Sequence, residues 1–140
     1  MSLPPEIAAF LDTCRVGVLG TVTGDGRPRQ SVVYYARSRE RLLVSTEASR
    51  WKARDVERTG WASLAVHGDQ PPFPSVTVAG PATILREDIG PSTAMVMQRI
   101  TGAAEPPEPQ TDEALAAVGR VILALDVQRV GPVSYVEADG

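Results

Sequence analysis

The sequence is poor in the residues that build disulfides and metal sites. Its 140 residues include one cysteine, Cys14, and one histidine, His67. A single cysteine excludes an internal disulfide and fits the reducing cytoplasm, where we expect the protein to reside. No Cys, Asp or Glu stands at a recognised ligand spacing from His67. We therefore predict no metal site and a structural role for His67.

A basic excess and long apolar runs are missing as well. The formal net charge is −3 and the isoelectric point is about 5.1, which argues against a general nucleic-acid binder. No segment approaches the roughly 20 apolar residues that a membrane-spanning helix needs. The N-terminus has neither the basic region nor the apolar run of a targeting signal. These absences favour a soluble protein that binds neither nucleic acid nor membranes.

The motifs of several catalytic classes are absent. No serine sits in a nucleophile elbow, and the sequence has neither a Walker motif nor a dinucleotide-binding glycine motif. Cys14 has no CxxC partner and no clear base beside it. We therefore predict no catalytic side chain. If the protein is an enzyme, a cofactor must supply its chemistry while the chain supplies position and charge.

What the sequence does contain is a regular series of short strands. Apolar residues make up 43% of the chain, enough for one domain over residues 1–140 with its own core. Hydrophobic runs between turn residues predict six strands: 16–22, 28–36, 41–45, 61–67, 75–85 and 120–127. The fifth is expected to bend at Gly80-Pro81, and 133–136 can extend the sheet. Helical patterns lie at 6–11, 49–58, 91–100 and 112–118. Short, hairpin-type connections favour a mainly β (α+β) fold, a six-stranded antiparallel barrel with a few short helices.

The junction between the third strand and the next helix carries an unusual charge pattern. Ser49 is the expected N-cap, so Arg50 and Lys52 fall in the first helical turn. Cations there oppose the helix dipole at a cost of about 0.3–1 kcal/mol each. Unpaired N–H groups at a helix start bind anions, so the pattern favours a phosphate site with Trp51 as a wall of its pocket. The alternative is ordinary solvated charge on a helix that also carries Arg54 and Arg58.

Two sets of residues on neighbouring predicted strands could line a planar ring with backbone groups and hydroxyls. They are Gln30, Ser31 and Val32 on the second strand, and Val44, Ser45 and Thr46 at the end of the third. The same residues are also ordinary sheet composition, so the pattern alone does not decide between the two interpretations.

Five segments carry a family resemblance through their order and spacing: Arg15–Thr21, Gly26–Tyr35, Leu42–Thr46, Arg50–Val56 and Ala62–Val66. Together they resemble the flavin and deazaflavin oxidoreductases with a split β-barrel, the pyridoxamine 5′-phosphate oxidase-like proteins. The resemblance covers nearly the whole chain and is strongest to the branch that uses the deazaflavin coenzyme F420. It implies an antiparallel split β-barrel of the FMN-binding type.

The resemblance also implies a homodimer with a cofactor at the subunit interface. Lys52 would bind the cofactor phosphate, with Arg50 and Trp51 beside it, and the two sets of strand residues would line the ring. Phe73 of the partner subunit would help to close the site. The implied reaction is hydride transfer between F420 and a small organic substrate.

Two alternatives stay open beside this reading. FMN can take the place of F420, because Arg50, Lys52 and Arg54 suit either phosphate. A non-catalytic protein that binds a cofactor or a haem-like ligand also fits a chain without a catalytic dyad. Residues 131–140 lack the Arg- and Trp-containing segment by which true pyridoxamine phosphate oxidases hold their substrate, which argues against vitamin B6 oxidation.

Overall fold

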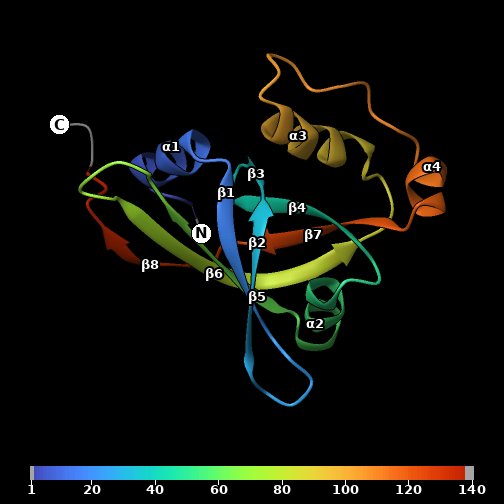
Figure 1. Ribbon diagram of the computed structural model, residues 1–140, viewed down its shortest axis with the longest axis horizontal. Helices are drawn as coiled ribbons and strands as arrows, with labels where there is room; N and C mark the ends of the chain where they lie inside the picture. Colours follow the sequence, from blue (N-terminus) through green and yellow to red (C-terminus); the bar gives the residue numbers. More distant parts are fainter. Residues whose placement is uncertain (1, 138–140) are drawn as a thin grey trace.

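The computed structural model describes residues 2–137 and shows an antiparallel sheet curled into a half-barrel with helices around it (Figure 1). The strands are β1 (Val16–Val22), β2 (Pro28–Tyr34), β3 (Ala36–Ser38), β4 (Arg41–Glu47), β5 (Trp61–His67), β6 (Ser75–Leu85), β7 (Arg120–Asp126) and β8 (Arg129–Ser134). The helices are α1 (Pro5–Thr13), α2 (Trp51–Thr59), α3 (Gly90–Thr101) and α4 (Asp112–Ala117). Among the described residues, no helix has both the length and the apolar composition to cross a lipid bilayer.

Strand β6 joins the two halves of the sheet. Residues 75–81 pair with β5, and the first part of this segment also pairs with β8, while residues 82–85 pair with β7. The hydrogen-bonded order is β2-β1-β5-β6-β7-β4-β3, with β8 beside β6. The change of partner falls at Gly80-Pro81, where the sequence predicts a bend. A Cβ atom on Gly80 would lie 1.8 Å from the Asp126 carbonyl oxygen, so this crossing requires glycine.

The prediction of six strands is wrong, because the described residues form eight. The predicted strand 28–36 is divided at Tyr35, whose side chain is fully buried and donates a hydrogen bond of 2.5 Å to the Leu11 carbonyl oxygen. Beyond Tyr35 the chain leaves β1 and pairs with β4 as β3. The other additional strand, β8, begins at Arg129, upstream of the extension predicted at 133–136, and pairs with β6.

Two apolar clusters lie on opposite sides of β4. Leu42 and Val44 pack in the larger cluster, inside the half-barrel. Leu43 faces the other way and packs in the smaller cluster with Val96 of α3 and Leu115 of α4. Successive side chains of β4 therefore point alternately into the two clusters. The smaller cluster holds α3 and α4 against β4 and β7.

Helices α3 and α4 form a cover over the outer face of β4 and β7 (Figure 1). The carboxylate of Asp112 accepts hydrogen bonds from the backbone N–H groups of Asp88 at 2.7 Å and Ile89 at 3.2 Å, which ties the start of α4 to the start of α3. The connecting residues 102–111 are exposed, as their Pro- and Glu-rich composition predicts. We call residues 90–117 the α3–α4 cover.

Candidate cofactor site

Helix α2 begins later than the sequence predicts. Arg50, not Ser49, is the N-cap, with extended dihedral angles of φ −70° and ψ 148°, and no side chain among residues 2–137 caps the first turn. Trp51 and Lys52 occupy the first two helical positions. The N–H groups of this turn lack a side-chain partner and lie at the positive end of the helix dipole, so the turn can bind an anion.

Lys52 lies half-buried in this first turn. Burial, with a smaller contribution from the charge of Arg50, lowers the pKa of Lys52 below its usual value. Within residues 2–137 no carboxylate pairs with Lys52, whereas Arg50 pairs with Glu47 at 3.7 Å. An anion bound at the start of α2 would therefore supply a counter-charge that the fold itself does not provide.

Trp51 is flanked by two guanidinium groups. Its side chain is 59% exposed, and the guanidinium carbons of Arg29 and Arg54 lie 5.2 Å and 4.9 Å from the ring centroid. These cation–π contacts bring an arginine from β2 and one from α2 to the same ring. The sequence pattern does not mark Arg29 as a site residue. The available signal was strand alternation, which places Arg29 on the face of the buried Val33.

A buried carboxylate, that of Asp55, joins α2 to the β1–β2 hairpin. Asp55 is only 1% exposed, and its Oδ2 atom accepts hydrogen bonds from Thr21 Oγ1 and Arg29 Nε, both at 2.8 Å. Oδ1 accepts a third hydrogen bond from Arg58 at 3.2 Å. Burial raises the pKa of Asp55, but these three hydrogen bonds outweigh burial, so the pKa lies below its usual value. Asp55 is thus ionised at neutral pH and fixes α2 against β2.

The predicted site residues of β2 point to two faces of the strand. Gln30 and Val32 are exposed on the outer face, and Ser31 is half-buried on the face of Arg29. The expectation that this strand lies next to β4 in the sheet is wrong, because among the described residues β2 pairs with β1, and β4 pairs with β3 and β7. The two strands approach each other without backbone hydrogen bonds. A ligand that touches both would bridge two unpaired strands.

The predicted residues of β4 alternate between the core and the cover. Val44 and Thr46 are buried, and Val44 packs in the larger apolar cluster, so its side chain is not available to a ligand. Ser45 faces the opposite way and lines a cavity of about 370 Å³ between β4 and the α3–α4 cover. Of the predicted site residues, Ser45 is the one that lines this cavity.

Phe73 lies on a different part of the molecule. Its side chain is exposed, in the connection between β5 and β6. Figure 1 shows that connection at the left edge of the molecule, while α2 lies at the lower right. Within one chain, Phe73 and the start of α2 are therefore not brought together, and a role for Phe73 of the partner subunit stays a prediction.

A known protein family matches nearly the whole chain. Residues 3–134 match the family described as Pyridoxamine 5′-phosphate oxidase, PNPOx_N. The chain belongs to this family. The match spans every strand, α2 and the α3–α4 cover, so the split-barrel fold expected from the order of the sequence segments is confirmed.

Solved structures of similar fold carry several different names. The conserved hypothetical protein Rv2991 from Mycobacterium tuberculosis is 27% identical, with 93% of this chain and 83% of that chain covered and a TM-score of 0.73. An F420 reductase is 23% identical, with 92% and 98% covered and a TM-score of 0.73. HutZ, the haem storage protein from Vibrio cholerae, is 19% identical, with 95% and 96% covered and a TM-score of 0.65. The last two likenesses show the fold alone. No curated protein matches the sequence.

Proposed function

We propose that the protein is an F420-dependent reductase that transfers hydride to a small organic substrate. The observation that carries this proposal is the start of α2, where Lys52 is half-buried without a carboxylate partner among residues 2–137, in a helical turn without a side-chain cap. A phosphate group satisfies both the free N–H groups and the ammonium group. An F420 reductase of the same fold, 23% identical, supports the choice of cofactor class.

The number of cations favours F420 over FMN. Arg29 and Arg58 share the carboxylate of Asp55, whereas within residues 2–137 neither Lys52 nor Arg54 has an ion pair. FMN carries one phosphate, while the longer tail of F420 is more anionic and can engage both free cations. FMN is the alternative cofactor, because a single phosphate still fits the start of α2.

The residues of this chain would bind and orient the cofactor rather than perform proton chemistry themselves. Lys52 and the first N–H groups of α2 would hold the phosphate, and Trp51 with its two arginines would border the tail. Ser31 and the backbone of Val44 and Ser45 would lie beside the ring. When bound, the deazaflavin ring supplies the hydride, which is why the protein needs no catalytic dyad.

We propose in addition that the protein is a cytoplasmic homodimer formed through the outer face of β1, β2 and β5. In the β1–β2 ladder Val16 lies opposite Tyr34 and Val18 opposite Val32, so these side chains share one face. This face leaves five large apolar side chains exposed: Val16, Val22, Val32, Tyr34 and Trp61. Apolar residues gathered in this way are typical of an interface, and a twofold contact here would place the partner subunit beside Gln30 and Val32.

Titration of the purified protein with each cofactor tests the proposal. We expect colourless protein that binds added F420 and oxidises reduced F420 when an acceptor is present. Yellow protein with a flavin spectrum would instead favour FMN. The haem storage protein from Vibrio cholerae has a similar fold. A haem-binding function would give a Soret band on addition of haemin and no turnover. Binding of neither F420 nor FMN would contradict the proposal.

A further inference from the structure

We infer that the cavity between β4 and the α3–α4 cover is a binding site for a small apolar carboxylic acid. Its lining is distinct from the start of α2, because Arg50 and Lys52 do not contribute to it. Ser45 is common to both sites, so the inference is tested on protein without cofactor, where the outcome does not depend on the cofactor proposal.

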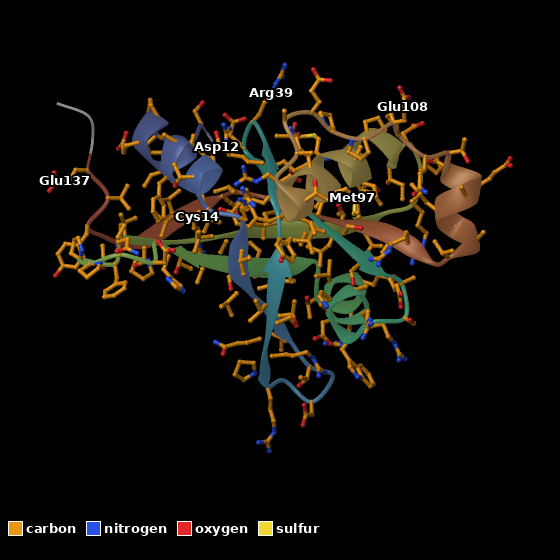
Figure 2. All side chains as sticks on the ribbon, turned by 45° about the horizontal axis from the view of Figure 1, so that its top comes forward. Asp12, Cys14, Arg39, Met97, Glu108 and Glu137 are labelled. Carbon is orange, nitrogen blue, oxygen red and sulfur yellow. The ribbon has the colours of Figure 1, made fainter. Side chains whose placement is uncertain are left out.

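Most of the cavity wall is apolar. Ala94, Met97 and Ile100 come from α3, while Leu115 and Val118 come from α4 and the turn after it. Three of these side chains, Met97, Ile100 and Val118, remain substantially exposed. Figure 2 shows Met97 projecting from α3, with Glu108 on the connecting segment above it. A bound apolar group would remove these exposed side chains from water, which gives a favourable free energy of binding.

The cavity is held open by fixed contacts rather than by loose loops. A Cβ atom on Gly90 would lie 2.3 Å from the Gln110 carbonyl oxygen, so the connecting segment packs directly against the start of α3. Just before α3, the backbone N–H groups of Asp88 and Ile89 donate hydrogen bonds to the carboxylate of Asp112. These bonds hold the start of α4 at the start of α3. A volume of about 370 Å³ lies within the range of roughly 300–1,000 Å³ that small-molecule pockets occupy.

Arg120 supplies the charge that selects an acid. It lies half-buried at the start of β7 and lines the cavity. Its direct neighbour across the β4–β7 ladder is Glu47, but the carboxylate of Glu47 pairs with Arg50. Glu108 also lines the cavity, yet within residues 2–137 Arg120 forms no ion pair with it or with any other acid. The guanidinium group is thus available for a two-point contact with a carboxylate.

The remaining polar groups narrow the class of ligand. The Thr93 hydroxyl donates to the Ile89 carbonyl oxygen at 2.7 Å, whereas within residues 2–137 Ser45 has no side-chain hydrogen bond and can add a donor beside Arg120. One cation with one nearby carboxylate, Glu108, does not suit a polyanion. The site therefore favours a ligand with one acidic group and an apolar body, such as a medium-chain or bicyclic aromatic acid.

A matched pair of probes tests the inference on the full-length protein without cofactor. We would titrate naphthylacetate and naphthylacetamide by calorimetry, because the two differ in charge but hardly in shape. The acid is expected to bind about tenfold or more tightly than the amide, the scale of a charge-assisted hydrogen bond. Equal affinities, or no binding of the acid at millimolar concentration, would overturn the inference. If a second copy of the chain covered this cavity in solution, the acid would not bind, and this result too would overturn the inference.

Variants locate the binding. Arg120→Gln should weaken acid binding by about tenfold while leaving the amide unchanged. Arg41→Gln is the matched control, because Arg41 lies at the other end of the same β4–β7 ladder, where it pairs with Asp126 at 2.8 Å. Ala94→Phe should fill the cavity and abolish binding of both probes, with circular dichroism to check its fold. Acid binding that survives Arg120→Gln at full strength would refute the assignment, whatever the fate of Ala94→Phe.

Discussion

The Nε atom of Arg29 donates a hydrogen bond of 2.8 Å to Oδ2 of Asp55, which fastens the outermost strand of the sheet to helix α2. The same guanidinium group lies over the ring of Trp51 at the start of that helix. One carboxylate therefore holds β2, and with it Arg29, against the helix that carries Lys52. Asp55 contacts the β1–β2 hairpin and does not pair with Lys52. Asp55 therefore positions helix α2, while Lys52 of the same helix is available to bind an anion.

Asp55→Asn should lower the free energy of unfolding by about 1–3 kcal/mol, because it removes the buried charge to which Thr21, Arg29 and Arg58 donate hydrogen bonds. Urea denaturation measures this loss. Asp25→Asn, in the exposed hairpin turn, is the matched control and should cost less than about 0.5 kcal/mol. Equal losses in the two variants would show that the buried contacts of Asp55 contribute nothing beyond surface charge.

The stabilisation by Asp55 should also depend on pH. Its folded pKa is depressed, so its contribution is complete above the unfolded value of about 3.9 and is lost as the pH falls through the folded pKa below that value. The difference in unfolding free energy between the original protein and Asp55→Asn should therefore shrink in acid. Denaturation curves measured from neutral pH down to about pH 3 test this; a difference that stays constant throughout would contradict it.

Lys52→Ala should weaken cofactor binding by roughly 1.5–3 kcal/mol, or about tenfold or more in dissociation constant, the scale of a charge-assisted hydrogen bond. Fluorescence titration with F420 measures the change, and Lys52→Arg should retain most of the affinity. Arg86→Ala is the control, because Arg86 is an exposed cation that pairs with Glu57 at 2.6 Å, away from the start of α2. Unchanged affinity in Lys52→Ala would remove this residue from the site.

The pKa of Lys52 leads to a prediction about pH. In the free protein this pKa is lowered by burial and by Arg50, and a bound anion should raise it again. Cofactor binding then takes up a proton in the pH range between the two values, so affinity should fall as pH rises toward the usual lysine value of about 10.4. Lys52→Arg should flatten this dependence, because arginine stays charged over the whole range. An equally steep fall in Lys52→Arg would assign the effect to another group.

Strands with an alternating or hairpin-forming sequence could be predicted from the sequence alone. Strand and helix limits that depend on tertiary contacts could not. The turn after β1 carried its own signal in Gly24-Asp25-Gly26, and Gly26 has the positive φ of 84° that such turns need. By contrast, nothing local marks Tyr35 as the point where a strand divides, since its burial depends on Leu11 of a distant helix. The N-cap was misplaced for a similar reason: the turn before α2 is set by the hydrogen bond from Ala48 to Gly119 at 2.8 Å.

The candidate site was predictable only where its residues are close in sequence. Arg50 and Lys52 stand out because cations at a helix start are unfavourable without a ligand. Arg29 and Asp55 looked like ordinary charged residues, because what distinguishes them is a contact between a strand and a helix. The cavity at Ser45 combines β4, α3 and α4, which no spacing in the sequence brings together.

The exposed face of the β1–β2 hairpin gives the most direct test of the proposed dimer. Val32 is 75% exposed in one chain and lies on this face, opposite Val18 in the ladder. In a twofold contact Val32→Glu would bury a carboxylate without a counter-charge, which should weaken dimerisation by about 3 kcal/mol or more. Light scattering over a range of protein concentrations measures the association.

Val118→Glu is the matched control for Val32→Glu. Val118 is also highly exposed, at 65%, but follows α4 on another part of the fold, so a charge there should leave the association unchanged. If the cofactor binds at the interface, Val32→Glu should also lose F420 affinity at dilutions where the original protein is still a dimer. A dimer that persists in Val32→Glu would place the interface elsewhere. A monomeric Val32→Glu variant that binds F420 normally would instead confine the cofactor site to a single chain, at the start of α2.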